Sequence, residues 1–177
     1  DKGLQLAIED LQSHGYLTAK LVAKNVFPRK PNRVDIIIQV IEGEQTLIGE
    51  IVLLGFQYIT RQQVLELLKI EQGQPFNPFG IEDGMQRLQN HYFSDGYLEF
   101  HLITPEEKII EFTENNRTAK IQLEVQEGHR VKVGEIKIHG LERTSRVVVE
   151  REIKIKKGEW WSGSKTQDLE TKLRRLG

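Results

Sequence analysis

Alternating apolar and polar positions predict several β-strands along the chain. The pattern is clearest in residues 132–139, which read KVGEIKIH. A period of two is typical of a strand with one buried face. Residues 47–54 repeat the pattern, and Gly55 and Gly140 end the two strands. Further strands are expected at 97–104 and 119–126 and, in the N-terminal part, at about 16–26 and 34–41.

Apolar residues spaced three and four positions apart predict amphipathic helices between the strands. The longest such stripe consists of Ile81, Met85, Leu88 and Tyr92. A shorter helix is expected after Thr60, because a Thr followed three residues later by Gln fits a capping box. Similar stripes lie near the two ends of the chain, at Leu4, Ile8 and Leu11 and at Leu169, Leu173 and Leu176.

Two stretches of the chain carry nearly the same sequence. Residues 40–55 read VIEGEQTLIGEIVLLG, and residues 125–140 read VQEGHRVKVGEIKIHG. The Glu-Gly, Gly-Glu-Ile and final Gly fall in register at an offset of 85 residues. This period is longer than that of typical solenoid repeats, which indicates small tandem domains.

A second match shows where the copies differ in length. The segment His14-Gly15-Tyr16-Leu17 aligns with Asp95-Gly96-Tyr97-Leu98 at an offset of 81 residues, four fewer. We therefore expect an insertion of four residues after Tyr97. The polar run at 106–118 is the expected place, as a loop, because loops accept added residues at little cost in free energy.

The order of elements defines a repeated β-α-α-β-β unit of about 84 residues, enough for a modest single core. The fold class is therefore α+β, as a tandem array of such units. Residues 1–44 are expected to be the α-β-β end of one unit, 45–128 a complete unit, and 129–177 the β-α-α beginning of a third. The chain has no initial Met and is expected to be a piece of a longer protein.

Composition excludes several classes of function. The net charge is −1 and the pI is near 6.6, whereas a general nucleic-acid-binding protein carries a basic stripe. No apolar run approaches the ~18 residues of a membrane-spanning helix. Because the chain has no cysteine, it has no disulfides, thiolate nucleophiles or cysteine zinc sites.

Motifs for catalysis and metal binding are missing from the sequence. The histidines lack the paired spacing that a metal needs, and neither a phosphate-binding glycine loop nor a nucleophile elbow occurs. We therefore expect no enzymatic activity, no cofactor and no metal site. Trp160 and Trp161 follow a basic run, but they align at the repeat offset with Pro75 and Phe76. They are expected to lie in the connection between two helices and to have a structural packing role rather than to bind nucleic acid.

The repeated unit resembles a known domain family. A Gly-Tyr pair leads into the second strand of the unit at Gly15-Tyr16 and Gly96-Tyr97. A Glu-Gly pair follows the third strand at Glu42-Gly43 and Glu127-Gly128. With a glycine-closed first strand and this order of elements, the whole chain resembles the POTRA domains of the BamA/TamA outer-membrane β-barrel assembly superfamily, the BamA branch above all.

The resemblance implies a fold, a location and partners. POTRA domains have a three-stranded mixed sheet packed against two helices, and lie in tandem in the periplasm before the C-terminal β-barrel that embeds the parent protein in the outer membrane. The implied partners are unfolded outer-membrane β-barrel proteins, with accessory lipoproteins or periplasmic chaperones, and no nucleic acid; the segment itself is expected to be soluble. Two alternatives stay open: the arm of a TamA-like or two-partner-secretion transporter, and a scaffold module of a division or assembly protein.

The resemblance also implies a binding surface at one edge of the sheet. In POTRA domains the second strand of the unit lies at an edge, where an extended client adds through main-chain hydrogen bonds. Glu99 and His101 are expected to point outward, as polar residues that guard an exposed edge. The client-binding residues expected in the complete unit are Leu98, Glu99, Phe100, His101, Leu102 and Ile103.

Three further apolar residues are expected on otherwise polar strand faces: Val52, Leu54 and Ile37. One interpretation is a contact with a neighbouring domain or a partner; the other is that single exposed apolar residues are ordinary. The incomplete units at the two ends also predict head-to-tail self-association, in which one molecule complements the next.

Overall fold

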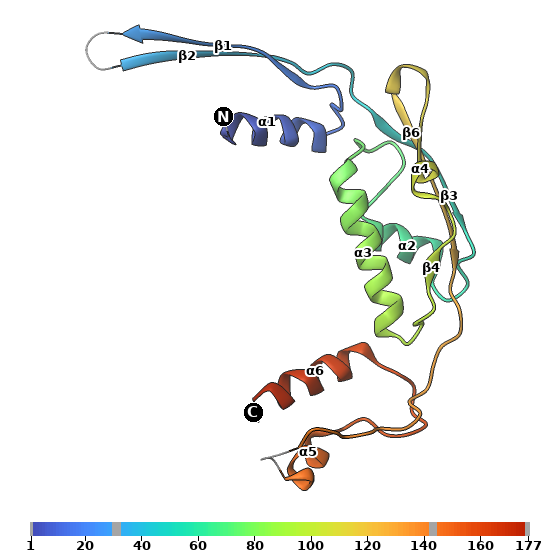
Figure 1. Cartoon of the computed structure of the whole chain (residues 1–177). Coiled ribbons are helices and arrows are strands. Elements are labelled where there is room, and N and C mark those ends of the chain that lie inside the picture. The colour runs from blue at the N-terminus through green and yellow to red at the C-terminus, as the bar shows by residue number, and fades with distance from the viewer. Residues whose placement is uncertain (1, 30–32, 142–144, 176–177) are drawn as a thin grey trace.

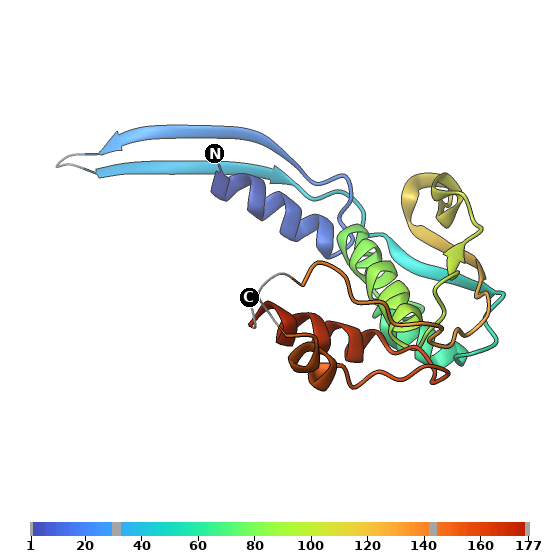
Figure 2. The same cartoon turned by 60° about the horizontal axis from the view of Figure 1, so that its bottom comes forward.

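The computed structural model describes residues 2–29, 33–141 and 145–175. The elements follow one another along an elongated molecule (Figure 1). A helix and a long hairpin lie at the N-terminal end, a sheet with two helices forms the middle, and two more helices follow at the C-terminal end (Figures 1 and 2). Neighbouring parts of the sequence are therefore neighbours in space.

The middle of the chain folds around a mixed sheet. Its first strand is β3 (Leu47–Leu54) and its central strand is β6 (Thr118–Gln126). β3 runs parallel to β6, whereas β4 (His101–Leu102) and β5 (Ile110–Phe112) pair antiparallel with the other side of β6. The sheet is thus three strands wide, and two short strands share one edge. The predicted α+β class with a mixed sheet is confirmed.

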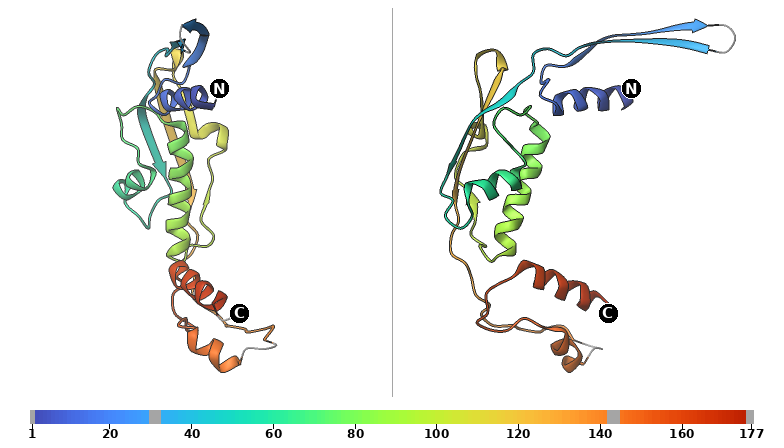
Figure 3. Two further views of the ribbon diagram at one scale, coloured as in Figure 1. Left: turned by 90° about the vertical axis from the view of Figure 1, so that its left-hand side faces the viewer. Right: turned by 180° about the vertical axis from the view of Figure 1, so that it is seen from behind.

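Two helices pack against this sheet (Figure 3). α2 (Arg61–Leu68) begins at Thr60, where the predicted capping box is present: the Thr60 hydroxyl accepts from the Gln63 N–H, and the Gln63 side chain accepts from the Thr60 N–H. α3 (Pro78–Ser94) begins at Asn77. The apolar faces of both helices and of β6 form the core, whose most deeply buried apolar side chains include Val64, Leu68, Phe76, Leu88, Tyr92, Ile121 and Leu123.

The N-terminal part consists of α1 (Lys2–Ser13) and a hairpin of β1 (Lys20–Arg29) and β2 (Arg33–Ile41). β1 begins later than predicted because the chain turns before it, with the Ala19 N–H donating to the Tyr16 carbonyl at 3.0 Å. Every residue of β2 is exposed. Residues 30–32, between the two strands, lie outside the described part of the chain.

The C-terminal part contains α5 (Arg146–Glu152) and α6 (Gly163–Arg174). The prediction of a strand at 132–139 is wrong: this segment forms only an isolated bridge between Lys132 and Trp160. A strand needs a neighbour that satisfies its main-chain groups, and within the described ranges no strand lies beside it as β6 lies beside β3. Leu176 of the predicted helical stripe lies outside the described residues.

The four-residue insertion lies in the edge strand rather than in a loop. His101 pairs with Gln126, and Ile110 pairs with Ile121. From His101 to Ile110 the edge advances nine residues, whereas from Gln126 to Ile121 β6 advances only five. The edge therefore contains four additional residues. The short helix α4 (Glu106–Ile109) has four residues, and it separates β4 from β5.

Two predictions about this region are therefore wrong in detail. The segment 106–118 is not a loop, because it contains α4, β5 and a 3₁₀ turn at Glu114–Asn116. The strand predicted at 97–104 shrinks to two residues. The chain is still turning after α3, with the Phe100 N–H donating to the Tyr97 carbonyl at 3.2 Å.

Candidate strand-binding edge

The edge beside β6 is built from two short strands on either side of α4. β4 contributes two residues and β5 contributes three. Between them, the main chain of Glu124 on β6 is already satisfied: its carbonyl accepts from the Ile103 N–H at 2.7 Å, and its N–H donates to Thr104 Oγ1 at 2.7 Å. An added strand would therefore meet two short pairing surfaces rather than one continuous edge.

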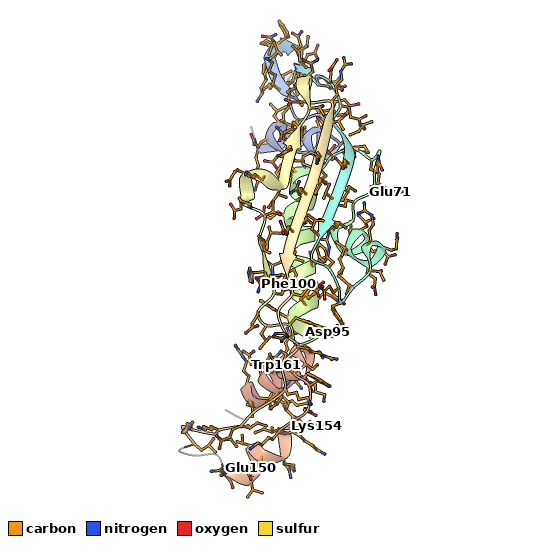
Figure 4. The ribbon with its side chains drawn as sticks, turned by 90° about the vertical axis from the view of Figure 1, so that its right-hand side faces the viewer. Glu71, Asp95, Phe100, Glu150, Lys154 and Trp161 are labelled. Atoms are coloured by element: carbon orange, nitrogen blue, oxygen red, sulfur yellow. The ribbon has the colours of Figure 1, made fainter. Side chains whose placement is uncertain are left out.

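Two of the six residues expected to bind clients face the core. Phe100 is 6% exposed, and its ring stacks on Tyr92 with the centroids 4.0 Å apart; Figure 4 labels Phe100 at this end of the sheet. Leu102 is half-buried against the same core. These side chains support the edge from inside.

The other four of these residues lie at the surface. Glu99 and His101 are exposed, and His101 Nδ1 lies 2.8 Å from the Glu99 carbonyl oxygen. Leu98 and Ile103 are apolar side chains with 44% and 48% of their surface exposed. The surface at this edge therefore combines polar and apolar groups.

The hairpin offers a longer edge, which was not among the predicted client-binding residues. β1 has ten residues and pairs with β2 on one side, with one irregularity between Leu21 and Ala23. No strand lies on its other side among the described residues. The sequence repeat could have identified this edge, because β1 follows Gly15-Tyr16 just as β4 follows Gly96-Tyr97.

The three residues expected to make a domain or partner contact do not come together. Val52 is half-buried and Leu54 is 46% exposed, two positions apart on β3. Ile37 is 56% exposed but lies on β2, in the separate hairpin. They form at least two distinct surfaces.

A compact set of hydrogen bonds joins the N-terminal part to the middle; we call it the first joint. The Thr46 N–H donates to the Gly15 carbonyl at 2.8 Å, and the Thr46 carbonyl accepts from the Phe76 N–H at 2.9 Å. The Gln45 side chain adds a bond to the His14 carbonyl at 2.9 Å. Thr46 thus bonds both to Gly15, just after the end of α1, and to Phe76 of the middle unit.

The second joint, between the middle and the C-terminal part, repeats these bonds at equivalent positions. The Val131 N–H donates to the Gly96 carbonyl at 2.9 Å, and the Val131 carbonyl accepts from the Trp161 N–H at 3.0 Å. Arg130 Nε donates to the Asp95 carbonyl at 2.8 Å, as Gln45 does to His14. Figure 4 shows Asp95 and Trp161 close together where the two parts meet.

A group of side-chain bonds within the middle unit lies next to the second joint. The Glu127 carboxylate accepts from the main-chain N–H groups of Gln57 and Tyr58 at 2.8 and 3.0 Å and from the Tyr92 hydroxyl at 2.6 Å. The Tyr58 hydroxyl donates to Asp95 at 2.6 Å, and this bond, with burial, raises the pKa of Tyr58 to about 12. Burial, followed by the bond to Glu127, raises the pKa of Tyr92.

The described ranges contain neither a membrane-spanning helix nor a metal-binding cluster. No helix there combines the length and the apolar character needed to cross a bilayer. No group of three or more His, Asp and Glu side chains in the same ranges is arranged to hold a metal ion.

Known proteins share this organisation. Residues 46–128 match the POTRA family model, described as surface antigen variable number repeat. A putative outer membrane protein assembly factor of Treponema pallidum is 30% identical over 159 residues, which cover 87% of this chain and 18% of that protein. The outer membrane protein assembly factor BamA of Buchnera aphidicola is 24% identical over 156 residues, which cover 83% of this chain and 25% of that protein.

A solved structure supports the fold along the whole chain. The crystal structure of Haemophilus influenzae BamA POTRA3-5 matches with a TM-score of 0.61 at 21% identity, covering 99% of this chain and 68% of that one. Residues 46–128 therefore form a POTRA domain, and the chain is similar in sequence and fold to BamA-like outer-membrane assembly factors.

The family sets the location of the chain. BamA POTRA domains are periplasmic parts of outer-membrane proteins, and this chain is accordingly periplasmic. It spans 18% and 25% of the length of the two curated relatives above. Those relatives are named for outer-membrane protein assembly rather than for an enzymatic reaction.

Proposed function

We propose that the chain is the POTRA segment of an outer-membrane protein assembly factor. It binds unfolded β-barrel clients by adding their extended segments to its open strand edges. The observation that carries this proposal is the side of β1, β4 and β5 that has no strand neighbour among the described residues. Pairing through the main chain depends little on client sequence, which suits a protein that handles many different barrel strands.

The two edges differ in how much pairing they offer. The ten residues of β1 form one surface, whereas β4 and β5 offer two and three residues separated by α4. We therefore propose that β1 holds an extended client more firmly. The edge at Leu98–Ile103 is a second and weaker contact, with Leu98, Glu99, His101 and Ile103 facing the client.

The same proposal divides the chain into successive domains. Residues 1–44, 45–128 and 129–177 are assigned to three POTRA domains, and the equivalent bonds of Thr46 and Val131 support boundaries just before these residues. Accessory lipoproteins or periplasmic chaperones are the proposed second class of partner. Val52, Leu54 and Ile37 are the proposed contact residues for neighbours of this kind.

Site-specific photo-crosslinking tests client binding. A crosslinking amino acid is placed at His101 or at Val26 of β1, and the probe is a urea-unfolded outer-membrane β-barrel protein diluted into buffer. We expect crosslinks from both positions, with the higher yield at Val26. Gln86, on the exposed face of α3, is the matched control. Equal yields at all three positions would contradict binding at the strand edges.

We also propose that chains of this sequence associate head to tail. Ile36 and Ile38 of β2 are 54% and 44% exposed, whereas the equivalent Ile121 and Leu123 of β6 are 0% and 1% exposed beneath their covering elements. The segment 132–139 is equivalent to β3, the strand beside β6. Supplied by a second copy together with α5 and α6, it would pair with β2 as β3 pairs with β6, and the helices would cover these side chains. Light scattering should show a mass that rises with concentration, and a constant monomer mass would contradict it.

A further inference from the structure

The recurring Gly-Glu-Ile motif forms an irregularity in β3, which is the edge strand on the other side of the sheet from β4 and β5. The pairing with β6 shifts between Ile48 and Ile51. Gly49 lies at this bulge, and a Cβ there would collide with the Thr118 methyl group. A bulge disturbs the regular spacing of main-chain groups that an added strand needs.

A short segment of the chain already pairs with the outer side of β3. The Ile48 N–H donates to the Gln74 carbonyl at 2.8 Å, and the Ile48 carbonyl accepts from the Gly73 N–H at 2.7 Å. Leu47 forms an antiparallel bridge with Pro75 in the same place. Both main-chain groups of Ile48 are therefore used within the chain.

Arg61 occupies the next acceptor along this edge. From the first turn of α2, its Nη2 donates to the Ile51 carbonyl at 2.9 Å. The two residues line a groove of about 580 Å³ between α2 and β3, with Glu71 of its rim labelled in Figure 4. The groove leaves room for an added strand to approach Ile51. The hydrogen bond from the Arg61 guanidinium is therefore what keeps the Ile51 carbonyl from accepting a bond from such a strand.

We infer that Arg61 determines which edge of the sheet accepts an added strand. The bulge and the segment at residues 73–75 close β3 around Ile48, and Arg61 closes it at Ile51. Strand addition is thereby directed to the β4–β5 side. This inference rests on the proposed function, because it names the residue that selects between the two edges.

The C-terminal part repeats most of this arrangement. The Val133 N–H donates to the Glu159 carbonyl at 2.8 Å, and the Val133 carbonyl accepts from the Gly158 N–H at 2.7 Å. Arg146 stands at the offset of 85 residues from Arg61, although here it pairs with Glu150. The segment that protects the strand edge thus forms even where the strand itself does not.

Removing Arg61 from the intact chain tests the inference. The probe is a biotinylated ten-residue peptide of alternating valine and threonine, and crosslinking amino acids are placed at Leu54 on β3 or at Ile103. We expect labelling at Ile103 and little at Leu54 in the parent chain. Arg61→Ala should raise labelling at Leu54 about fivefold or more, because the Ile51 carbonyl becomes free to accept a main-chain hydrogen bond from the peptide. Labelling at Ile103 should stay unchanged.

The neighbouring exposed Gln62 supplies the control, because Gln62→Ala keeps the Arg61 bond. Circular dichroism and a urea midpoint establish that each variant is folded, and Arg61→Gln replaces Arg61→Ala if the latter unfolds. Unchanged labelling at Leu54 in a folded Arg61 variant overturns the inference, whatever happens at Ile103. If Ile103 is never labelled, the proposed client edge fails, whereas a rise at Leu54 still supports the role of Arg61.

Discussion

Gly55 and Gly73 show how differently two glycines with similar backbone conformations act in this fold. Their φ angles are 83° and 86°, in the left-handed region. A Cβ at residue 55 would collide with the Val125 carbonyl oxygen, whereas nothing lies within 4 Å of a Cβ at residue 73. Gly55→Ala should lower the free energy of unfolding by about 3 kcal/mol, and Gly73→Ala by about 1 kcal/mol through backbone strain alone. Equal losses in urea unfolding would contradict this account.

Tyr58 links alkaline pH to stability at the second joint. Its raised pKa of about 12 means that folding favours the protonated phenol. This contribution is complete below the unfolded pKa of about 10 and is lost as pH rises from about 10 to 12. Tyr58→Phe should cost about 1 kcal/mol at neutral pH by removing the bond to Asp95. It should also reduce the alkaline loss without abolishing it, since the pKa of Tyr92 is raised too.

Urea unfolding from neutral pH to about pH 12 measures both effects of the Tyr58 substitution. Tyr16→Phe, directly after Gly15 of the first joint, is the control for loss of a phenol hydroxyl. An alkaline stability profile that Tyr58→Phe leaves unchanged would show that the bond to Asp95 does not stabilise the fold.

At the scale of elements, the sequence predicts correctly the helices and strands whose packing neighbours lie within the chain. The apolar stripe at 81–92 and the alternation at 119–126 form α3 and β6, which both pack against the core of the middle unit. The segment 132–139 has the clearest alternation of all, yet it forms no strand, because alternation records a face to bury and not the presence of a neighbour. The bond from Arg61 to Ile51 could not be predicted, since it depends on how α2 approaches the sheet.

For the candidate edge, the sequence predicts which side chains face the core and which face the solvent, but it does not predict how long the paired strand is. Phe100 faces the core and His101 faces the solvent, which alternation can indicate. The offsets of the repeat indicate four additional residues, but they do not say that these residues form α4 inside the edge strand. Local periodicity cannot show this, because the interruption is defined by the pairing with β6.

Deleting Glu106–Ile109 should join β4 and β5 into one edge strand. The deletion removes the four residues by which the two pairings with β6 differ in register. Because a longer edge offers more main-chain pairing, the labelling of His101 by an unfolded barrel protein should rise about threefold or more, a gain of about 0.7 kcal/mol. Replacing the same four residues with glycine and serine keeps the interruption and is the control. Unchanged labelling would contradict the idea that α4 weakens this edge.

At the scale of the whole molecule, two equivalent joints maintain the extended arrangement of the three parts (Figure 3). Val131→Pro removes the N–H that donates to Gly96, so it should loosen the second joint. Spin labels at Gln86 on α3 and Thr171 on α6 should report a distance distribution about twice as broad as in the parent chain. Lys137→Pro, beyond the joint in the same segment, is the control. An unchanged width with Val131→Pro would mean that other contacts set the geometry.

Amide hydrogen exchange on the intact chain tests the open strand edges most directly. Exchange is followed with and without a urea-unfolded outer-membrane β-barrel protein as the probe. The account predicts slower exchange in the peptides that contain β1, with a smaller effect at β4 and β5 and none at β3, because added main-chain hydrogen bonds protect the amides of the edge that receives the client. Protection confined to the helices or to β3, or no protection at all, would contradict strand addition as the way this chain binds clients.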